Sequence, residues 1–296
     1  MKEKVVRTMV KYAIIANDYQ ESTQLVNKIS KLLQENHLKE DLSNPQYVFI
    51  IGGDGTLLRA VNKFQDIIDK VFFIVIKSGS LGFYANYDEN TYPKAIKAII
   101  NNKVHIRQMP LLEIKYNGNL ICYALNEAKV VDHVKTICTD IYVNNDLLEH
   151  FRGSGLVFAT KTGSTGYMRA INGSIIAANI STLWQLKEIA PVANSTFSTI
   201  NASIILDQDQ IIRLNGELKG KSLVIDTYES EILSSDVELK ISQKTLNLCY
   251  DKENDLSLIA KMKLLFAHCN DNRGEAPCAM NRQKNNYCEI VFLFFY

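Results

Sequence analysis

The sequence predicts two fold classes in series within one chain of 296 residues, an α/β region followed by an all-β region. Before about residue 103, short apolar runs alternate with helix-like patterns. After it, most stretches are short and rich in alternating or β-branched residues, with turn signals such as NGN, VNND and NGELKG between them. The hydrophobic share of 47% and the charged share of 22% are typical of a globular protein that buries a core.

The first 102 residues are predicted to form a Rossmann-like domain with a parallel sheet. Its strand runs are too apolar to alternate, which is typical of strands buried on both faces of such a sheet. The βαβαβ order of the elements leads to the same prediction. The predicted strands cover residues 12–16, 47–51 and 71–76, and the predicted helices cover residues 21–38, 56–66 and 92–101.

Residues 103–248 are predicted to form an antiparallel, β-sandwich-like domain. The predicted strands cover residues 111–116, 120–131, 139–143, 155–159, 203–206, 210–214, 221–226 and 237–241. One helix is expected to interrupt them at 181–189, where Trp184, Leu186 and Ile189 have helical spacing and are predicted to be core or subunit interface. Residues 249–266 are predicted to return and pack on the α/β domain, and residues 267–296 to be a disordered tail.

Charge and targeting signals exclude several function classes. With 33 basic and 32 acidic residues the net charge is +1, so no large positive field indicates nucleic acid or a membrane surface as a partner. No apolar run reaches spanning length and the N-terminus lacks a signal-peptide core, so the sequence predicts a cytoplasmic protein. Six scattered cysteines without a CxxC pair favour free thiols, and no metal-ligand spacing is found, so no protein metal site is predicted.

The stretch FIIGGDGTLLRA places three glycines and Asp54 directly after a predicted buried strand. In an open parallel sheet, ligands bind beyond the carboxyl ends of the strands, where this loop lies. Gly53 and Gly55 allow backbone N–H groups to approach an anion, and the start of the next helix adds a favourable dipole. Asp54 can accept a proton from a hydroxyl or help to hold a magnesium–phosphate group. The alternative is a tight turn with Asp54 as a helix N-cap only.

Two further stretches are expected near this loop. KSGSLGFYANY follows the next strand and carries Gly79 and Gly82, so both glycine turns would face one crevice. ALNEAKV places Asn126 and Glu127 inside a β stretch, and an amide with a carboxylate suits ribose hydroxyls and base edges. Neighbours in a strand point to opposite faces, so both serve a ligand only if the strand bulges or ends there. A solvent-facing pair on a hairpin is the alternative.

A third stretch, FATKTGSTGYMRAINGSI, is rich in small hydroxyl side chains. Thr160, Thr162, Ser164 and Thr165 follow the predicted strand 155–159 and can hydrogen-bond a heterocycle or a phosphate. Tyr167 offers a ring face for stacking. An ordinary Ser/Thr-rich loop is the alternative interpretation.

Together these motifs resemble those of the NAD kinase family, especially its shorter bacterial type. They are GGDGT at 52–56, SLGF at 80–83, NE at 126–127, RGSGL at 152–156 and TKTGSTGY at 160–167, in the order of the family. The likeness covers about residues 11 to 265. GGDGT alone is shared with phosphofructokinases and with diacylglycerol and sphingosine kinases, whereas the NE pair and the TGSTGY loop are far more specific to NAD kinases.

The resemblance implies transfer of the γ-phosphoryl group of ATP, or of polyphosphate, to the 2′-hydroxyl of the adenosine ribose of NAD, which gives NADP. The reaction would use Mg²⁺ carried with ATP, and the chain would form a homodimer or homotetramer. By the family pattern, Asp54 would be the base, with Gly53 and Gly55 in the phosphate loop. The implied substrate-binding residues are Asn126, Glu127, Arg152, Ser154, Thr162, Ser164, Thr165, Gly166, Tyr167 and Ala170. Arg152 and Ser154 would reach the site of a neighbouring subunit.

Departures from the family pattern concentrate in the dinucleotide pocket. Ser154 replaces an aspartate that would contact the nicotinamide-side ribose, and Ala170 replaces a frequent serine. Lys161 stands where the family has proline, and its cation can meet a phosphate; Ser80 stands where the family has histidine. The phosphate loop itself is intact. A catalytically impaired homologue that acts as a dinucleotide-binding or scaffold protein is therefore the alternative hypothesis.

Restoring the aspartate tests the role of Ser154. The Ser154→Asp variant is expected to have a KM for NAD that is roughly ten- to a hundredfold lower, with little change in kcat, because a hydrogen bond worth about 1–3 kcal/mol is restored. Steady-state kinetics of NADP formation measure both constants. An unchanged KM would mean that residue 154 does not contact the dinucleotide.

Overall fold

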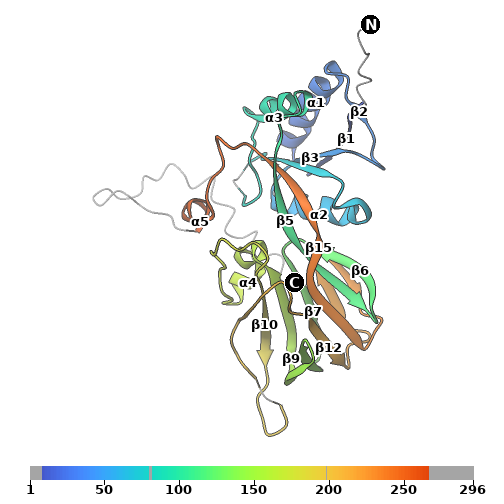
Figure 1. Ribbon diagram of the computed structural model, residues 1–296, viewed down its shortest axis with the longest axis vertical. Coiled ribbons are helices and arrows are strands. Elements are labelled where there is room, and N and C mark those ends of the chain that lie inside the picture. The colour runs from blue at the N-terminus through green and yellow to red at the C-terminus, as the bar shows by residue number, and fades with distance from the viewer. Residues whose placement is uncertain (1–8, 80–81, 198, 267–296) are drawn as a thin grey trace, which may run out of the picture. The chain divides into compact units, whose positions relative to one another are not determined.

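The computed structural model describes residues 9–79, 82–197 and 199–266 of the chain (Figure 1). The chain divides into two compact units, Met1–Leu258 and Ile259–Tyr296. Every described strand and the helices α1 to α4 belong to the first unit. Helix α5 (Leu258–Phe266) begins at the boundary and provides the described residues of the second unit. Ser80, Leu81 and the predicted tail at 267–296 lie outside the described residues.

The N-terminal part contains a parallel sheet with helices on both faces. Its strands are β1 (Lys11–Ala16), β2 (Lys39–Glu40), β3 (Tyr47–Ile51) and β4 (Phe72–Ile76), in the spatial order β2-β1-β3-β4. Its helices are α1 (Gln20–Glu35), α2 (Asp54–Lys63), the short 3₁₀ helix η1 (Gln65–Ile67) and α3 (Tyr92–Ile100). The residues of β3 are buried along its whole length, as expected for a strand covered on both sides.

The two faces of this sheet have separate hydrophobic cores because side chains alternate along each strand. Phe49 of β3 packs in one core with Ile29 of α1 and Ile96 of α3. Val48 packs in the other core with Leu57 of α2. Helices α1 and α3 therefore cover one face and α2 the other, which directs the start of α2 to the carboxyl edge of β3.

The C-terminal part is built from antiparallel strands. They are β5 (His105–Tyr116), β6 (Asn119–Ala124), β7 (Glu127–Val131), β8 (Ile137–Val143), β9 (Asp146–Thr160), β10 (Trp184–Pro191), β11 (Ile204–Leu206), β12 (Ile212–Gly216), β13 (Ser222–Ile225), β14 (Tyr228–Glu231) and β15 (Asp236–Tyr250). The short helices η2 (Thr162–Thr165) and α4 (Tyr167–Ala170) follow β9. Inward side chains of β5 to β15, such as Phe151 and Leu239, form one core.

Strand β15 joins the antiparallel and parallel strands into one hydrogen-bonded sheet (Figure 1). Its first part pairs antiparallel with β12, and its last part pairs parallel with β4 through Asn247, Leu248 and Cys249. Strand β5 runs antiparallel along most of its length. The fold is therefore a mixed sheet with parallel N-terminal and antiparallel C-terminal strands, and the predicted fold class is confirmed.

The predicted helix at 181–189 is wrong, because residues 184–191 form strand β10. Strand β10 pairs antiparallel with β9 on one side and with β11 on the other. Trp184 and Leu186, two residues apart, both enter the core, so the same apolar residues fit a strand period as well as a helical one. The expectation that Trp184 is core is confirmed, since this side chain is fully buried.

Several predicted strands also have different limits in the structure. Those predicted at 111–116 and 155–159 begin earlier, at His105 and Asp146. The run 120–131 divides into β6 and β7, with Leu125 and Asn126 between them. The strand predicted at 237–241 continues to Tyr250, because its second half pairs with β4.

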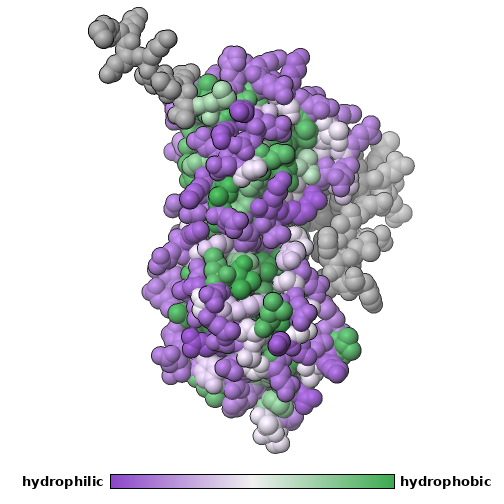
Figure 2. All heavy atoms as spheres, turned by 90° about the vertical axis from the view of Figure 1, so that its right-hand side faces the viewer, coloured by the Kyte–Doolittle hydropathy of each residue, from purple (hydrophilic) through white to green (hydrophobic). Residues whose placement is uncertain are grey.

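The surface shown in Figure 2 is mainly hydrophilic, with smaller hydrophobic groups between, as is normal for a folded domain. None of the helices that the structure describes has both the length and the apolar character that a membrane crossing requires.

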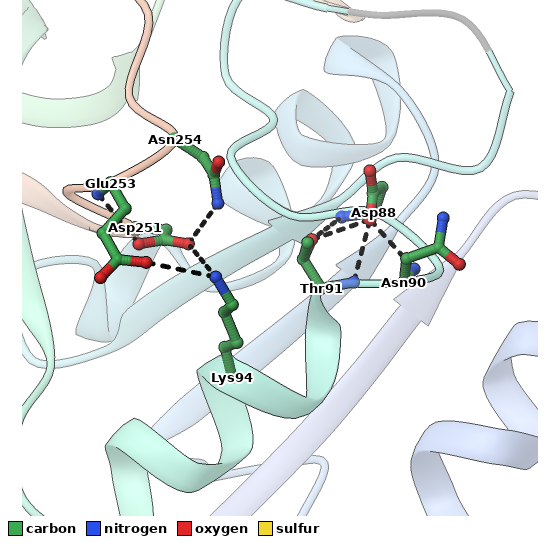
Figure 3. A network of polar contacts seen from close by, with 7 residues as sticks. All are labelled: Asp88, Asn90, Thr91, Lys94, Asp251, Glu253 and Asn254. Atoms are coloured by element: carbon green, nitrogen blue, oxygen red, sulfur yellow. Dashed lines mark hydrogen bonds and ion pairs between the residues drawn. The ribbon is translucent and has the colours of Figure 1, made fainter.

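Polar contacts fix the turn before α3 and attach the segment after β15 to this helix (Figure 3). The Oδ1 atom of Asp88 accepts hydrogen bonds from the backbone N–H of Asn90 and from both the N–H and the hydroxyl of Thr91. Lys94 in the first turn of α3 lies 3.3 Å from Glu253 Oε2 and 3.8 Å from Asp251 Oδ2. Residues 251–253 are thereby linked to α3.

Removal of the Asp88 carboxylate is expected to destabilise the fold. The Asp88→Ala variant removes the side-chain acceptor of three hydrogen bonds, so the free energy of unfolding should fall by about 1 kcal/mol, as at a lost helix cap. Urea denaturation measures the change. Glu89→Ala, at the exposed neighbouring position, is the matched control. Equal stabilities of the two variants would contradict the prediction.

Candidate active site

Strand β3 leads directly into the first glycine turn, which places Asp54 at the start of α2. Gly52 has φ +151°, and a Cβ there would lie 2.4 Å from Thr56 Oγ1, so only glycine fits this reversal of the chain. The N-cap of α2 is Gly53 rather than Asp54. The alternative that Asp54 serves only as the N-cap is therefore wrong.

The carboxylate of Asp54 is oriented by the second glycine turn. Its Oδ2 accepts a hydrogen bond of 2.8 Å from the N–H of Phe83, and its Oδ1 one of 3.2 Å from the N–H of Tyr84. A Cβ on Gly82 would lie 2.3 Å from Asp54 Oδ1, so the absence of a side chain makes this approach possible. The two glycine turns therefore meet at the Asp54 carboxylate, as expected for loops that follow neighbouring strands of a parallel sheet.

Tyr84 connects this carboxylate to the β-rich part of the chain. Its buried hydroxyl donates to the side-chain oxygen of Asn126. Burial raises the pKa of Tyr84 well above its usual value, so the phenol stays protonated and acts as a donor. Sequence reasoning missed Tyr84, although its place directly after the second glycine turn was a signal for it.

Asp226 holds the backbone of the Asn126–Glu127 pair. Its carboxylate accepts hydrogen bonds of 2.8 to 3.0 Å from the N–H groups of Leu125, Asn126 and Glu127. Burial raises the pKa of Asp226 to about 6, against the effect of these three bonds. Sequence reasoning missed this residue, because only the pairing of β13 with β7 brings the β13–β14 turn to this point.

The side chains of Asn126 and Glu127 face the same side. Strand β7 begins at Glu127, so Asn126 lies outside the strand and the alternation of side chains does not apply to it. The two residues can serve one ligand only if the strand bulges or ends at this point, and the strand boundary meets this condition. A Cβ on Gly166 would lie 3.3 Å from Glu127 Oε2 and 3.9 Å from Asn126 Nδ2, so both polar groups point to the TGSTGY loop.

Glu127 is a buried carboxyl group with an unused acceptor. The residue is 7% exposed, and among the described residues no donor pairs with Oε2. Burial raises the pKa of Glu127 to about 8, the charge of Asp226 adds to this, and Lys129 opposes it. An unpaired buried acceptor is costly, and a ligand hydroxyl placed here would supply the missing donor.

The TGSTGY loop packs directly on the backbone of Asn126. A Cβ on Gly163 would lie 2.0 Å from the carbonyl oxygen of Asn126, so glycine is required for this contact. The hydroxyls of Thr160 and Thr162 both donate to the carbonyl oxygen of Leu125, at 2.6 and 3.3 Å. The loop and the Asn126–Glu127 pair therefore form one unit.

The other residues of the loop divide into internal and exposed positions. Ser164 is fully buried and its Oγ accepts from the N–H of Ile176, while Thr165 donates to the carbonyl oxygen of Thr162. Gly166 and Ala170 are exposed. The ring of Tyr167 is half-buried and lies 4.2 Å from Lys129 Nζ.

Arg152 and Ser154 do not join this group within one chain. Ala159 of β9 pairs with Glu127, and Ser154 precedes it by five residues, which is about 17 Å along a strand. Arg152 donates through Nε to Thr136 Oγ1 at 3.2 Å, and its guanidinium lies 5.5 Å from the ring centre of Phe197. In the described part of the chain, no three His, Cys, Asp or Glu side chains come together as a metal cage.

Comparison with known proteins shows to which class of protein the chain belongs. The model of the ATP-NAD kinase N-terminal domain matches residues 21–104, and that of the ATP-NAD kinase C-terminal domain matches residues 98–246. Both describe kinases. The chain is 32% identical to the NAD kinase of Lactobacillus helveticus over 242 residues, which cover 80% of this chain and 89% of the relative. It is 34% identical to that of Lactobacillus delbrueckii subsp. bulgaricus over 221 residues, 73% and 83% of the two chains.

Solved structures share the fold. Yeast NADH kinase complexed with NADH superposes with a TM-score of 0.71 at 17% identity, over 91% of this chain and 90% of that chain. An NAD kinase from Archaeoglobus fulgidus in complex with ATP superposes with a TM-score of 0.69 at 18% identity, over 86% and 99%. The chain belongs to the NAD kinase family and is an NAD kinase enzyme, which confirms the resemblance.

The buried Glu127 predicts a pH dependence of stability. Its pKa of about 8 in the folded chain lies above its ordinary value of 4.5, so the folded chain keeps a proton that the unfolded chain loses. The free energy of unfolding should therefore fall as pH rises from about 5 to about 8.

Glu127→Gln should make this fall less steep, because the amide does not ionise. Urea denaturation at several pH values measures the slope, with the exposed Glu217→Gln as the matched control. A slope that is the same in Glu127→Gln and in the unsubstituted chain would contradict the assignment.

Proposed function

We propose that Asp54 is the general base that accepts the proton of the 2′-hydroxyl of the adenosine ribose of NAD. The ribose oxygen then forms a bond to the γ-phosphorus of ATP, the bond from that phosphorus to the β–γ bridging oxygen breaks, and NADP and ADP result. The observation that carries this proposal is the orientation of the Asp54 carboxylate by the N–H groups of Phe83 and Tyr84. A group fixed in this way can align the nucleophile without reorganisation.

The phosphates of the donor are proposed to lie at Gly53 and Gly55. Gly53 is the N-cap of the ten-residue helix α2 and Gly55 is exposed, so backbone N–H groups and the helix dipole are available to an anion there. ATP is the proposed donor, supported by the complex of the Archaeoglobus relative with ATP.

Mg²⁺ is the proposed metal, carried with ATP. The residues fit it, since Mg²⁺ is usually held by substrate phosphates and one or two carboxylates rather than by a protein cage, and Asp54 is the carboxylate at the glycine turns. When bound, Mg²⁺ neutralises charge on the phosphates and on the transferring group.

The adenosine moiety is proposed to bind at Asn126 and Glu127. The unpaired Oε2 of Glu127 is a fitting acceptor for a hydroxyl or amino donor. Thr162, Ser164 and Thr165 would shape the adjoining loop. Thr165 donates to the carbonyl oxygen of Thr162 within it, while Thr162 donates to the carbonyl oxygen of Leu125 and Ser164 accepts from the N–H of Ile176. Gly166, Tyr167 and Ala170 would border the dinucleotide beyond. The complex of the yeast relative with NADH supports a dinucleotide as acceptor.

A homodimer or homotetramer is proposed as the working form. Arg152 and Ser154 lie about 17 Å or more along β9 from Glu127, too far to contact the adenosine part of its ligand within one chain. They would instead serve the dinucleotide of a neighbouring copy. The cytoplasm is the proposed compartment, since Cys122, Cys138 and Cys249 carry the free thiols that a reducing compartment maintains.

The role of Asp54 is tested by Asp54→Asn. The amide retains the size of the side chain but cannot take up the ribose proton, so kcat should fall at least about a hundredfold with little change in NAD binding. A coupled assay of NADP formation from NAD, ATP and magnesium measures kcat, and titration calorimetry measures NAD binding. Circular dichroism checks that the variant is folded.

Two outcomes would contradict this function. Equal rates for Asp54→Asn and the unsubstituted chain would show that Asp54 is not the general base. NAD binding without any NADP above the level of the variant would instead favour an impaired homologue that only binds dinucleotide.

A further inference from the structure

Lys129 lies on the substrate-facing side of β7, two residues after Glu127. Ala128 and Val130 enter the core of the β-rich part, so Glu127 and Lys129 share the opposite face. The cross-strand partners of these two residues on β9 are Ala159 and Val157, which pack with Met168 of α4 and against Tyr167. Lys129 therefore lies beside the TGSTGY loop, about 7 Å along the strand from Glu127.

Among the residues that the structure describes, the ammonium group of Lys129 has an aromatic neighbour but no ion-pair partner. Its Nζ lies 4.2 Å from the ring centre of Tyr167. Within the described ranges, no carboxylate comes close enough to form an ion pair with it. The side chain is half-buried, and burial lowers the pKa of Lys129 against the opposing effect of Glu127, Glu229 and Asp226. A cation that has lost much of its hydration in this way is stabilised when an anionic ligand binds beside it.

Because the neighbouring groups are carboxyl groups, an anionic ligand at this strip needs a cation to offset their charge. Hydrogen bonds connect Asp54 to Asp226 through Tyr84 and Asn126. The backbone N–H of Glu127 also donates to Asp226, so the strip carries three carboxyl groups. A dinucleotide brings a pyrophosphate with two negative charges to this acidic surface. Lys129 supplies a positive charge at the end of the strip away from Asp54.

We propose that Lys129 binds the pyrophosphate of the dinucleotide substrate and thereby selects dinucleotides over nucleosides. This inference rests on the proposed function, in which the 2′-hydroxyl faces Asp54 and the adenosine lies at Asn126 and Glu127. The 5′ side of the ribose then continues toward Tyr167 and Lys129. The ammonium forms a charge-assisted hydrogen bond with a pyrophosphate oxygen, and the ring of Tyr167 holds the ammonium in place.

Binding of two probes, NAD and adenosine, tests the proposal by titration calorimetry. Lys129→Met should weaken NAD binding at least about tenfold, since the charge-assisted bond is lost, and should change adenosine binding less than about threefold. Lys129→Arg should retain NAD binding, because the charge is kept. Lys135→Met, at an exposed lysine soon after β7, is the matched control and should bind both probes normally.

Adenosine lacks the pyrophosphate, so its binding shows whether Lys129 contacts the pyrophosphate directly or acts through another residue. Equal weakening of NAD and adenosine by Lys129→Met would overturn the proposal, because the residue would then act through Glu127 or Tyr167. Unchanged NAD binding would overturn it as well. A second measurement is the salt dependence of the KM for NAD, which should be smaller in Lys129→Met than in the unsubstituted enzyme.

The same measurements test the proposed function separately from the inference about Lys129. If the unsubstituted chain and all Lys129 variants form no NADP from NAD and ATP, the proposed function fails. If NADP forms and Lys129→Met retains the KM for NAD of the unsubstituted chain, only the inference about Lys129 fails.

Discussion

The hydrogen bonds to the carboxylate of Asp226 determine the position of the peptide segment on which the rest of the candidate site depends. Three consecutive N–H groups, from Leu125 to Glu127, donate to this one side chain, where β6 has ended and β7 begins. Without this acceptor, three backbone donors at a partly buried turn would lose their partners, which is costly. The bonds thereby fix where the side chains of Asn126 and Glu127 emerge, and Gly163 packs on the same backbone.

Close backbone approach explains why particular glycines stand in the motifs. Gly82 leaves room for the carboxylate of Asp54, and Gly163 leaves room for the carbonyl group of Asn126. In both places a methyl group would overlap with the neighbour. The two contacts belong to different parts of the sheet, and Tyr84 joins them through its hydrogen bond to Asn126. The proposed base, Asp54, and the proposed adenosine-binding pair, Asn126 and Glu127, are thus positioned by one continuous set of contacts.

The electrostatics of the candidate site lower the stability of the fold. Burial raises the pKa of Glu127 to about 8 and that of Asp226 to about 6, so both carboxyl groups lose favourable solvation on folding. The unpaired Oε2 of Glu127 adds to this cost. Functional sites commonly contain buried polar groups that a stable core would exclude. A hydroxyl group of a bound substrate would supply the donor that Glu127 Oε2 lacks.

The sequence by itself determined the features that local chemistry controls. The apolar run 47–51 followed by GGDGT predicts β3, the turn and α2 correctly, because burial on both faces and the glycine conformations act within a few residues. Motif order was sufficient for the family. Only the tertiary structure placed Tyr84, Asp226 and Lys129 at the site, made β10 a strand at Trp184 and extended β15 to Tyr250. These features depend on pairing between segments far apart in the chain, such as β13 with β7 and β15 with β4, and no short-range pattern contains that information.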